Sequence, residues 1–395
     1  MSSALSIGIV CYPSLGGSGV VASELAVGLA RRGHRVHLIA SAPPSRALPA
    51  CEGLSFHRVS VSDYPLFEHP PYTLAVASTI VSVANDHRLD LVHVHYAVPH
   101  AASAYLAGQV LDRAAPRFVT TLHGTDVTGV GSDPSSQSMT RFTVAASDGI
   151  TVPSQFLRRE AHRLLGLPDD PPIEVIPNFV DTDHFAPADR RDRTRLHELF
   201  AAVAGEATER DGPILFHVSN FRVVKRVADL FEVLVRVRRH IPARLVLIGD
   251  GPERTHAAQR VHDLGLTQSV CFLGKRPDFV EYLKHADAFL LPSESESFGV
   301  AALEALSAGV PVFAYRVGGL PEVVTDGAGR LVEPFDVDAL AYAVLDVVTD
   351  AERRKTFGAA ARACALAHFR CEPALDQYEA YYRRVLAAAP TAEIR

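Results

Sequence analysis

Cysteine is scarce in this sequence, and its pattern matches none of the common cysteine-based sites. The 395 residues include five cysteines, and no two of them have the paired spacing of a zinc site. An odd number of cysteines without such pairs is typical of reduced thiols. We therefore expect a cytoplasmic protein whose cysteines are free.

Excess positive charge and long apolar runs are also missing. The formal net charge is −6, so the chain lacks the basic footprint of a polyanion-binding protein, and no nucleic-acid partner is expected. No stretch reaches the length of a membrane span. The strand-like run Ile7–Val10 follows no basic segment with a long apolar one behind it, so no secretory signal is expected.

The composition that remains is that of an ordinary globular protein, with 48% hydrophobic and 21% charged residues. A chain of 395 residues exceeds what one core usually holds, so we expect two domains. Both halves alternate apolar strand-like runs with helical patterns, which predicts the α/β class with two doubly wound parallel sheets. Strands are expected at residues 7–11, 36–40, 91–95, 118–122, 214–218, 244–248, 270–273, 288–291 and 312–314, and helices at 19–32 and 72–88.

The boundary between the two domains is expected near the turn-rich segment Pro177–Phe185, which follows the strand-like run Ile173–Ile176. We place an N-terminal domain at residues 1–180 and a C-terminal domain at residues 181–371. The charged, alanine-rich segment 190–211 is expected to open the second domain with a helix and a mobile loop.

The most informative motif spans Ser295–Glu304, in which two carboxylates lie on either side of a Phe-Gly pair. The apolar run Leu290–Pro292 indicates a buried strand before the motif, and a helical pattern follows it. Glu296 should therefore lie at a strand-to-helix turn, and Glu304 about two helical turns further on. The backbone N–H groups of 298–300 would be available to a phosphate. This favours a nucleotide-sugar site; the alternative is a helix with two solvated carboxylates.

A glycine-rich turn, Gly16-Gly17-Ser18-Gly19, follows the first expected strand and precedes a helix. Such a turn lets the backbone approach an anionic ligand closely. Gly17 and Gly19 also have the spacing of a dinucleotide-binding fingerprint, with Ala22 in the third position. No acidic residue for a ribose follows the second strand at Ala40-Ser41. A dehydrogenase is therefore retained only as an alternative.

Histidines mark the ends of two further strands in the first half. His123 follows the apolar run 118–122, so we expect it at the carboxyl end of a parallel strand, where ligands bind. The alternative is a histidine fixed by a backbone hydrogen bond. His93 and His95 lie on one face of a strand. A metal is one possibility, but no third ligand is evident, and packing with hydrogen bonding is favoured.

A basic turn follows the first strand of the second half. Arg222, Lys225 and Arg226 lie within seven residues of Asn220 and suit a diphosphate, although a solvated basic turn is the alternative. The tight turn Gly249–Pro252 after the next strand is expected to have a geometric role.

Taken together, these motifs resemble the GT-B retaining glycosyltransferases, specifically their fourth family. The resemblance runs through nearly the whole chain. It is carried by the Gly16-Gly17 turn, His123, Lys225, the Gly249–Pro252 turn, the pair Glu296 and Glu304, and the segments Gly309–Pro311 and Gly318–Glu322. It implies two Rossmann-like domains facing a central cleft, with a C-terminal helix at about 372–395 that packs back on the first domain.

The resemblance also implies roles for individual residues. His123, Glu296 and Lys225 would be catalytic. The donor would be bound by Gly16, Gly17, Asn220, Arg222, Lys225, Arg226, Glu296, Phe298, Gly299, Val300 and Glu304, and the acceptor by Ser18, Tyr96, Thr120, Thr121 and Arg141. Many members have arginine where this chain has Asn220, so either Arg222 or Arg226 is expected to supply the missing charge.

Four segments resemble more closely the members that act in bacillithiol biosynthesis: Cys11–Gly19, His93–His100, Thr120–Asp126 and Val218–Arg222. This implies UDP-N-acetylglucosamine as the donor and L-malate as the acceptor, with retention at the anomeric carbon. No Asp-x-Asp metal motif stands in a suitable place, so no cofactor and no divalent metal are expected. The family also makes a homodimer plausible. An inositol phosphate, lipid or polysaccharide acceptor, and a non-catalytic sugar-nucleotide-binding module, are the alternatives.

Overall fold

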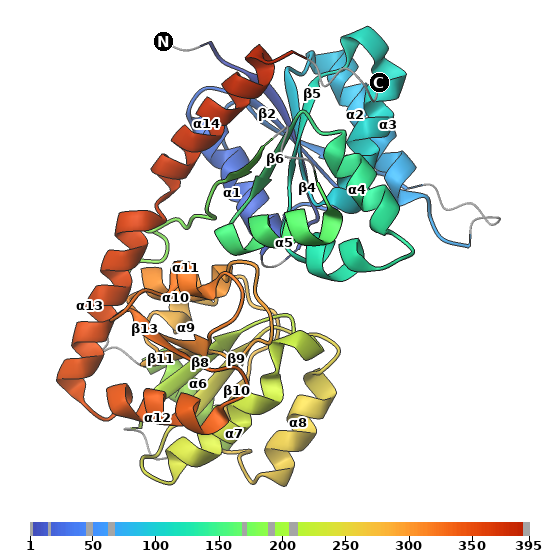
Figure 1. The fold of residues 1–395 in the computed structure, drawn as a ribbon. Coiled ribbons are helices and arrows are strands. Elements are labelled where there is room, and N and C mark those ends of the chain that lie inside the picture. The colour runs from blue at the N-terminus through green and yellow to red at the C-terminus, as the bar shows by residue number, and fades with distance from the viewer. Residues whose placement is uncertain are drawn as a thin grey trace. The chain divides into compact units, whose positions relative to one another are not determined.

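The computed structural model of the chain describes residues 3–14, 17–44, 50–61, 68–167, 172–188, 194–204 and 212–389. The chain divides into two compact units (Figure 1). Unit 1 comprises Met1–Asn178 together with Glu372–Arg395, and unit 2 comprises Phe179–Cys371. Each unit has its own sheet and its own core, and each is described by itself.

Unit 1 is built on a seven-stranded sheet with the order β3-β2-β1-β4-β5-β6-β7. Every neighbouring pair is parallel. The central strands are buried along their whole length, as expected for parallel strands covered by helices on both faces. The strands are β1 Ser6–Val10, β2 Arg35–Ala40, β3 Leu54–Arg58, β4 Leu91–His95, β5 Arg117–Thr121, β6 Gly149–Val152 and β7 Ile173–Val175.

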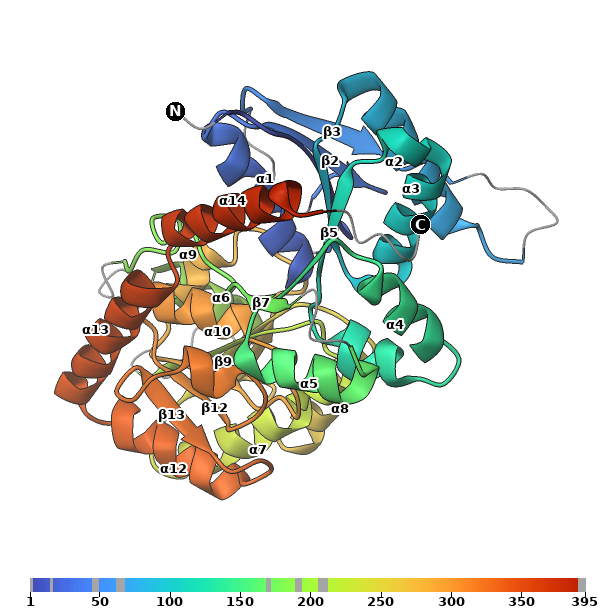
Figure 2. The same ribbon diagram turned by 45° about the horizontal axis from the view of Figure 1, so that its top comes forward.

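Helices of unit 1 cover both faces of this sheet, with α2 and α3 on one face and α1 and α14 on the other (Figures 1 and 2). The helix α14 closes the core although it lies far away in the sequence. The Tyr382 hydroxyl is 2.7 Å from His93 Nδ1 in β4, and Leu375 packs directly over Gly28. The helices are α1 Ser18–Arg31, α2 Tyr72–His87, α3 Ala102–Leu111, α4 Gln137–Ala145, α5 Gln155–Leu165 and α14 Cys371–Ala387.

Unit 2 contains a six-stranded sheet with the order β10-β9-β8-β11-β12-β13, again parallel throughout. The strands are β8 Ile214–Val218, β9 Arg244–Ile248, β10 Val270–Phe272, β11 Ala288–Leu291, β12 Val312–Tyr315 and β13 Gly329–Val332. The helices are α6 Thr194–Ala204, α7 Val227–Arg238, α8 Arg254–Asp263, α9 Val280–Leu283, α10 Val300–Ser307, α11 Leu320–Val323, α12 Val337–Val348 and α13 Ala351–His368.

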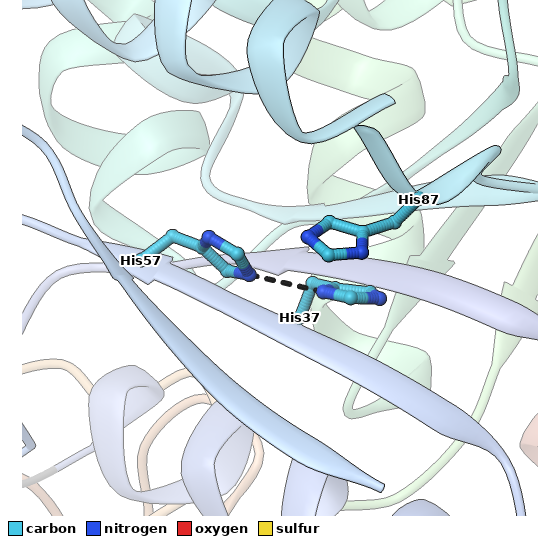
Figure 3. Close-up of side chains that lie close together, drawn as sticks. All are labelled: His37, His57 and His87. Carbon is cyan, nitrogen blue, oxygen red and sulfur yellow. Dashed lines mark hydrogen bonds between the residues drawn. The ribbon is translucent and has the colours of Figure 1, made fainter. Parts of the chain in front are cut away.

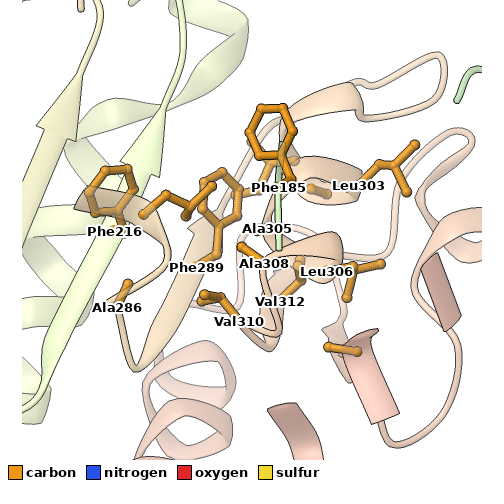
Figure 4. Close-up of a cluster of buried hydrophobic side chains, with 14 of the residues drawn as sticks. Phe185, Phe216, Ala286, Phe289, Leu303, Ala305, Leu306, Ala308, Val310 and Val312 are labelled. Carbon is orange, nitrogen blue, oxygen red and sulfur yellow. The ribbon is translucent and has the colours of Figure 1, made fainter. Parts of the chain in front are cut away.

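One face of the unit 2 sheet is packed by aromatic and small side chains (Figure 4). Phe216 and Phe289 from neighbouring strands meet Leu303 and Leu306 of α10, and all four are fully buried. Each buried side chain of this size contributes roughly 1.5–3 kcal/mol through the hydrophobic effect. The α10 helix is therefore fixed firmly against the sheet, which positions the loop that precedes it.

The predicted α/β class with two doubly wound sheets is confirmed. Predicted strands and helices agree with the structure to within about two residues where the apolar run is continuous, as in 72–88 against α2. The strands β3, β6 and β13 were not predicted, because each is short and not a continuous apolar run. None of the described helices is long and apolar enough to cross a membrane.

Candidate functional site

In unit 2, the loops that follow four neighbouring strands meet at one edge of the sheet. The strands β8 and β11 are adjacent, and the sheet order runs away from this pair in opposite directions. Such a switch point is where open α/β sheets bind ligands. The Glu294 N–H donates to the Val224 carbonyl at 2.8 Å, and the Gly319 N–H to the Glu296 carbonyl at 2.9 Å. These bonds connect the loops that follow β8, β11 and β12.

Lys225 and Glu296 lie at the centre of this edge. The Lys225 Nζ donates to Glu296 Oε1 at 2.6 Å, and the Ser293 hydroxyl donates to the same oxygen at 2.8 Å. The exposed fractions of the two charged side chains are 20% and 11%, so the pair is largely shielded. The structure thus joins two residues that the sequence placed on separate motifs. Ser293 was missed, because a lone serine after a strand carries no distinctive signal.

A second missed residue, His217, supports the loop that carries Lys225. It is fully buried in β8, where its Nδ1 donates to the Leu290 carbonyl and its Nε2 accepts from the Ser219 hydroxyl, both at 2.8 Å. Burial lowers the pKa of His217 to about 4. The imidazole is therefore neutral at pH 7. Its two hydrogen bonds connect β8 to β11 and to the turn that follows β8.

The two candidate arginines differ in their surroundings. The Arg226 guanidinium makes a two-pronged ion pair with Asp229 at 2.7 and 2.9 Å and stacks on the Phe335 ring at 4.6 Å. Asp229 also accepts from the Tyr315 hydroxyl. Arg222 is exposed, and its side chain has no hydrogen bond or ion pair among the described residues. The Arg226 side chain is thus held by contacts within unit 2, whereas the Arg222 side chain is available to bind a ligand.

Glycines make the close packing of these loops possible. Gly318 has φ = +57°, and a Cβ there would lie 1.8 Å from the Glu296 carbonyl oxygen. At Gly249, with φ = +119°, a Cβ would lie 1.7 Å from the Ser219 carbonyl oxygen. No other residue fits at these contacts without moving the backbone. The turn 249–252 thus has the geometric role that the sequence suggested, and Asn220 lies in the turn it supports.

The α10 helix begins directly after the Glu296 loop. Gly299 is the N-cap residue of this helix and has φ = +100°. The N–H groups of 298–300 therefore lie at the start of the helix, where no helical carbonyl group is available to accept them. Phe298 is buried in the core below. Glu304, in the second turn, is only 5% exposed. A helix beginning beside Lys225 and Glu296 offers dipole and cation together to an anion.

In unit 1, the switch point lies between β1 and β4, and aromatic and imidazole rings gather there. Tyr12, which follows β1, has its ring centroid 5.6 Å from that of Tyr96 and 4.5 Å from that of His100. His123 follows β5, and its ring centroid is 5.2 Å from that of Tyr96. The predicted residues Tyr96 and His123 are therefore neighbours at the carboxyl ends of β4 and β5.

His123 is half-buried and bonds to a group of fully buried imidazoles. Its Nε2 lies 2.8 Å from His95 Nδ1, and burial lowers the pKa of His123 to about 3, helped by the nearby His100. It is therefore neutral at pH 7 and suited to hydrogen bonding rather than to proton donation from an imidazolium. The buried Asp126 carboxylate accepts the N–H groups of His123, Gly124 and Ala97, which fixes the backbone at this corner.

The remaining predicted residues of unit 1 are spread out. Thr120 Oγ1 lies 2.7 Å from Ser147 Oγ, and Thr121 Oγ1 lies 2.6 Å from His93 Nε2, so both hydroxyls are bonded within the core. Because the other nitrogen of His93 bonds Tyr382, the hydrogen-bonding interpretation of His93 is confirmed. Arg141 lies exposed on α4.

The glycine-rich turn is only partly described. Gly17 is the N-cap of α1, with φ = +61°, and Ser18 is the first residue of that helix. Gly16 lies outside the described residues. Of the segment 190–211, the structure describes the helix α6, which agrees with the expected helix. The expected mobile loop falls on residues 205–211, which lie outside the described residues.

Two family models match the chain, one on each half. The Glycosyltransferase Family 4 model matches residues 15–184, and the Glycosyl transferases group 1 model matches residues 203–363. Among solved structures, sucrose-phosphate synthase from Thermosynechococcus elongatus has a TM-score of 0.77 at 22% identity, covering 98% of this chain and 100% of that one. Anabaena HepE in complex with UDP and glucose has a TM-score of 0.76 at 20% identity, covering 96% of this chain and 99% of that one. The fold is therefore GT-B, as predicted.

Comparison with characterised relatives identifies the class of glycosyltransferase. The N-acetyl-alpha-D-glucosaminyl L-malate synthase of Bacillus anthracis is 42% identical over 97% of both chains. A D-inositol 3-phosphate glycosyltransferase of Mycolicibacterium paratuberculosis is 28% identical, covering 94% of this chain and 86% of the relative. This chain belongs to glycosyltransferase family 4 and is an enzyme of that family.

Proposed function

We propose that this enzyme transfers N-acetylglucosamine from UDP-N-acetylglucosamine to the hydroxyl group of L-malate, the first step of bacillithiol biosynthesis. Full-length similarity at 42% identity to an N-acetyl-alpha-D-glucosaminyl L-malate synthase carries this proposal. The five free cysteines fit the cytoplasmic location that we expect. We also retain the expectation of a homodimer, which rests on the family resemblance.

Unit 2 would bind the nucleotide part of the donor. The start of α10 and the Lys225 ammonium offer donors and positive charge to the diphosphate, and Arg222 adds a second cation beside them. Glu304 would accept hydrogen bonds from the ribose hydroxyls, and Glu296 from the sugar. Lys225 would then share its ammonium between Glu296 and the phosphate on which negative charge develops.

Unit 1 would supply His123 to orient the sugar and a set of donors to the acceptor. Malate is a small dianion, so its binding requires cations or several hydrogen-bond donors. Ser18, Tyr96 and Arg141 are the proposed acceptor contacts with donors to offer, and Arg141 suits a carboxylate because its guanidinium binds two oxygens at once. The Thr120 and Thr121 hydroxyls would have to exchange their present partners to contribute.

The chemistry we propose is a substitution with retention. The bond between the anomeric carbon and the phosphate oxygen breaks, and a bond to the malate oxygen forms on the same face of the sugar. The malate hydroxyl proton passes to the departing phosphate oxygen, and UDP leaves. Lys225 and Arg222 would neutralise the leaving group, so this step uses no divalent metal.

The decisive assay is release of UDP from UDP-N-acetylglucosamine with and without L-malate, followed by mass analysis of the product. We expect UDP release that depends on malate and a product with the mass of glucosaminyl-malate carrying the N-acetyl group. Release that instead depends on D-inositol 3-phosphate would assign the acceptor of the 28%-identical relatives. Donor binding without turnover on any acceptor would contradict the proposed function and favour a binding module.

The structure predicts different roles for the two arginines of the basic turn. Replacing Arg222 with alanine should raise the KM for the donor about tenfold or more, because a hydrogen bond to a charged group contributes about 1.5–3 kcal/mol. Replacing Arg226 with alanine should chiefly lower the thermal stability, because it leaves Asp229 without its ion pair. Donor KM and unfolding temperature, measured for both variants, distinguish these outcomes. Equal effects on donor KM would contradict the assignment.

A further inference from the structure

Three histidines of unit 1 lie together at a place that the proposed transfer reaction does not use: His37 in β2, His57 in β3 and His87 at the end of α2 (Figure 3). Among the described residues, this is the one group of three histidine, cysteine or carboxylate side chains whose ligand atoms lie within 4.8 Å of one another. Figure 3 shows one nitrogen of each ring turned toward a common point.

The sheet register explains how residues far apart in sequence meet here. His57 pairs with Ile39, which is two residues after His37, so His37 and His57 lie diagonally on the same face of neighbouring strands. The α2 helix packs on that face through Val76, Ile80 and Val83. Its last residue, His87, therefore reaches the same spot, and the Ser6 hydroxyl donates to its carbonyl.

The distances are close to those of a metal site. His37 Nδ1 and His57 Nε2 are 3.0 Å apart, and the His37 and His87 rings stack with centroids 4.2 Å apart. Zinc–nitrogen bonds of about 2.0–2.1 Å at tetrahedral angles set ligand nitrogens about 3.4 Å apart. A small rotation of the half-buried His87 side chain would give this spacing. The metal would replace the hydrogen bond between His37 and His57, and the proton of that bond would move to the other nitrogen of its own ring.

The electrostatics favour neutral imidazoles, the form that binds metal. Burial, then His87, His57 and Arg35, lower the pKa of His37 to about 4. Burial and His87 lower the pKa of His57, while Asp86 opposes this. The His37 and His57 rings are therefore ready ligands at pH 7. Asp86 and the carboxyl end of the α2 dipole attract a cation, whereas Arg35 repels one.

We propose that His37, His57 and His87 bind one divalent transition-metal ion of the zinc class, with solvent in the open fourth position. Three imidazoles suit Zn²⁺, Co²⁺ or Ni²⁺ and not Mg²⁺ or Ca²⁺, which prefer oxygen ligands. The ion would link the edge strand β3 to β2 and α2, because it joins one side chain from each. Its role would be structural, since it would join three elements of unit 1 and none of its three ligands belongs to the proposed transfer site.

The test uses untagged, chelator-treated full-length protein, titrated with Zn²⁺ by calorimetry and with Co²⁺ by visible absorption. We expect one equivalent to bind, the spectrum of a four-coordinate Co²⁺ site, and a higher unfolding temperature with Zn²⁺. His57→Gln and His87→Gln should each weaken binding about tenfold or more. His87 is only half-buried and is the last residue of α2, so its variant should fold normally. His256→Gln, which removes an exposed histidine of unit 2, is the matched control.

Each result decides the proposal. Absence of saturable Zn²⁺ binding, or binding that His57→Gln and His87→Gln leave unchanged, would overturn it. Binding that His256→Gln weakens equally would assign the metal to surface histidines instead. Chelation and the His87→Gln variant should leave malate-dependent UDP release unchanged, so this inference and the proposed function can fail separately.

Discussion

Replacing Lys225 with alanine should lower the kcat for sugar transfer by about 10²- to 10³-fold. The reason lies in the position of its ammonium, which is 2.6 Å from Oε1 of Glu296 in the loop that leads to α10. We propose that this charge is matched by Glu296 in the free enzyme and by the departing diphosphate during transfer. Its removal takes away that stabilisation and leaves the shielded Glu296 carboxylate without its counter-charge. Steady-state kinetics with UDP release as the readout would measure the loss.

Two further variants make this experiment specific. Lys225→Arg keeps the charge but alters the geometry, so it should recover part of the kcat. Lys355→Ala removes an exposed lysine from α13 of the same unit and should leave the kcat unchanged. If folded Lys225→Ala retained the wild-type kcat and differed only in donor KM, the residue would bind the donor without assisting bond cleavage.

Lowering the pH from 7 to 5 should destabilise unit 1 strongly. Burial lowers the pKa of His93 and His123 to about 3 and that of His100 to about 4. In the unfolded chain these groups take up protons near pH 6.5, so their stabilisation is present above that pH and is lost as the pH falls toward 4. Each neutral histidine costs up to about 1.4 kcal/mol of unfolding free energy per pH unit in this window.

One carboxyl group acts in the opposite direction. Burial raises the pKa of Asp126 to about 6, so its contribution to stability is lost as the pH rises through that value and regained as the pH falls. It offsets roughly one histidine, and the net change stays destabilising. The chain has no tryptophan, so circular dichroism during urea unfolding at pH 7, 6 and 5 is the suitable measurement.

The predicted loss of stability at low pH can be tested by comparing a shielded histidine with an exposed one. His123→Asn should reduce the pH dependence of the unfolding free energy by about one proton, whereas the exposed His256→Gln should not change it. Unit 2 has His217 as a comparable buried histidine, with a pKa lowered to about 4. Unit 1 should therefore lose its structure at a higher pH than unit 2. An unfolding free energy that stays constant between pH 6.5 and 5 would contradict this.

The fold could be predicted largely because its parallel strands are buried on both faces. Runs such as Leu91–His95 and Arg244–Ile248 are buried at every residue, and continuous apolar segments bounded by turns are readily recognised. The edge strand β3 was missed because Leu54–Arg58 is only partly buried and contains serine, histidine and arginine. Its position depends on backbone pairing with β2, which sequence patterns do not reveal.

The candidate site could be predicted where a residue belongs to a motif at a strand end. Lys225 and Glu296 meet because β8 and β11 are neighbours, as the doubly wound fold requires. The supports beneath them, His217 and Ser293, belong to no pattern. The cluster of His37, His57 and His87 was even harder to predict from the sequence. Its members are 20 and 30 residues apart and meet only through tertiary packing. The catalytic and binding roles themselves stay predictions until they are measured.

The return of α14 to unit 1 has a consequence for how the protein is made. Unit 1 is interrupted in sequence by all of residues 179–371, so ribosomes complete unit 2 before they produce the helix that covers β4. Until then His93 lacks Tyr382, and Gly28 of α1 lacks the leucine that packs on it. Until α14 has been synthesised, unit 1 therefore exposes an apolar face to solvent. We expect unit 1 to depend more than unit 2 on chaperones during synthesis.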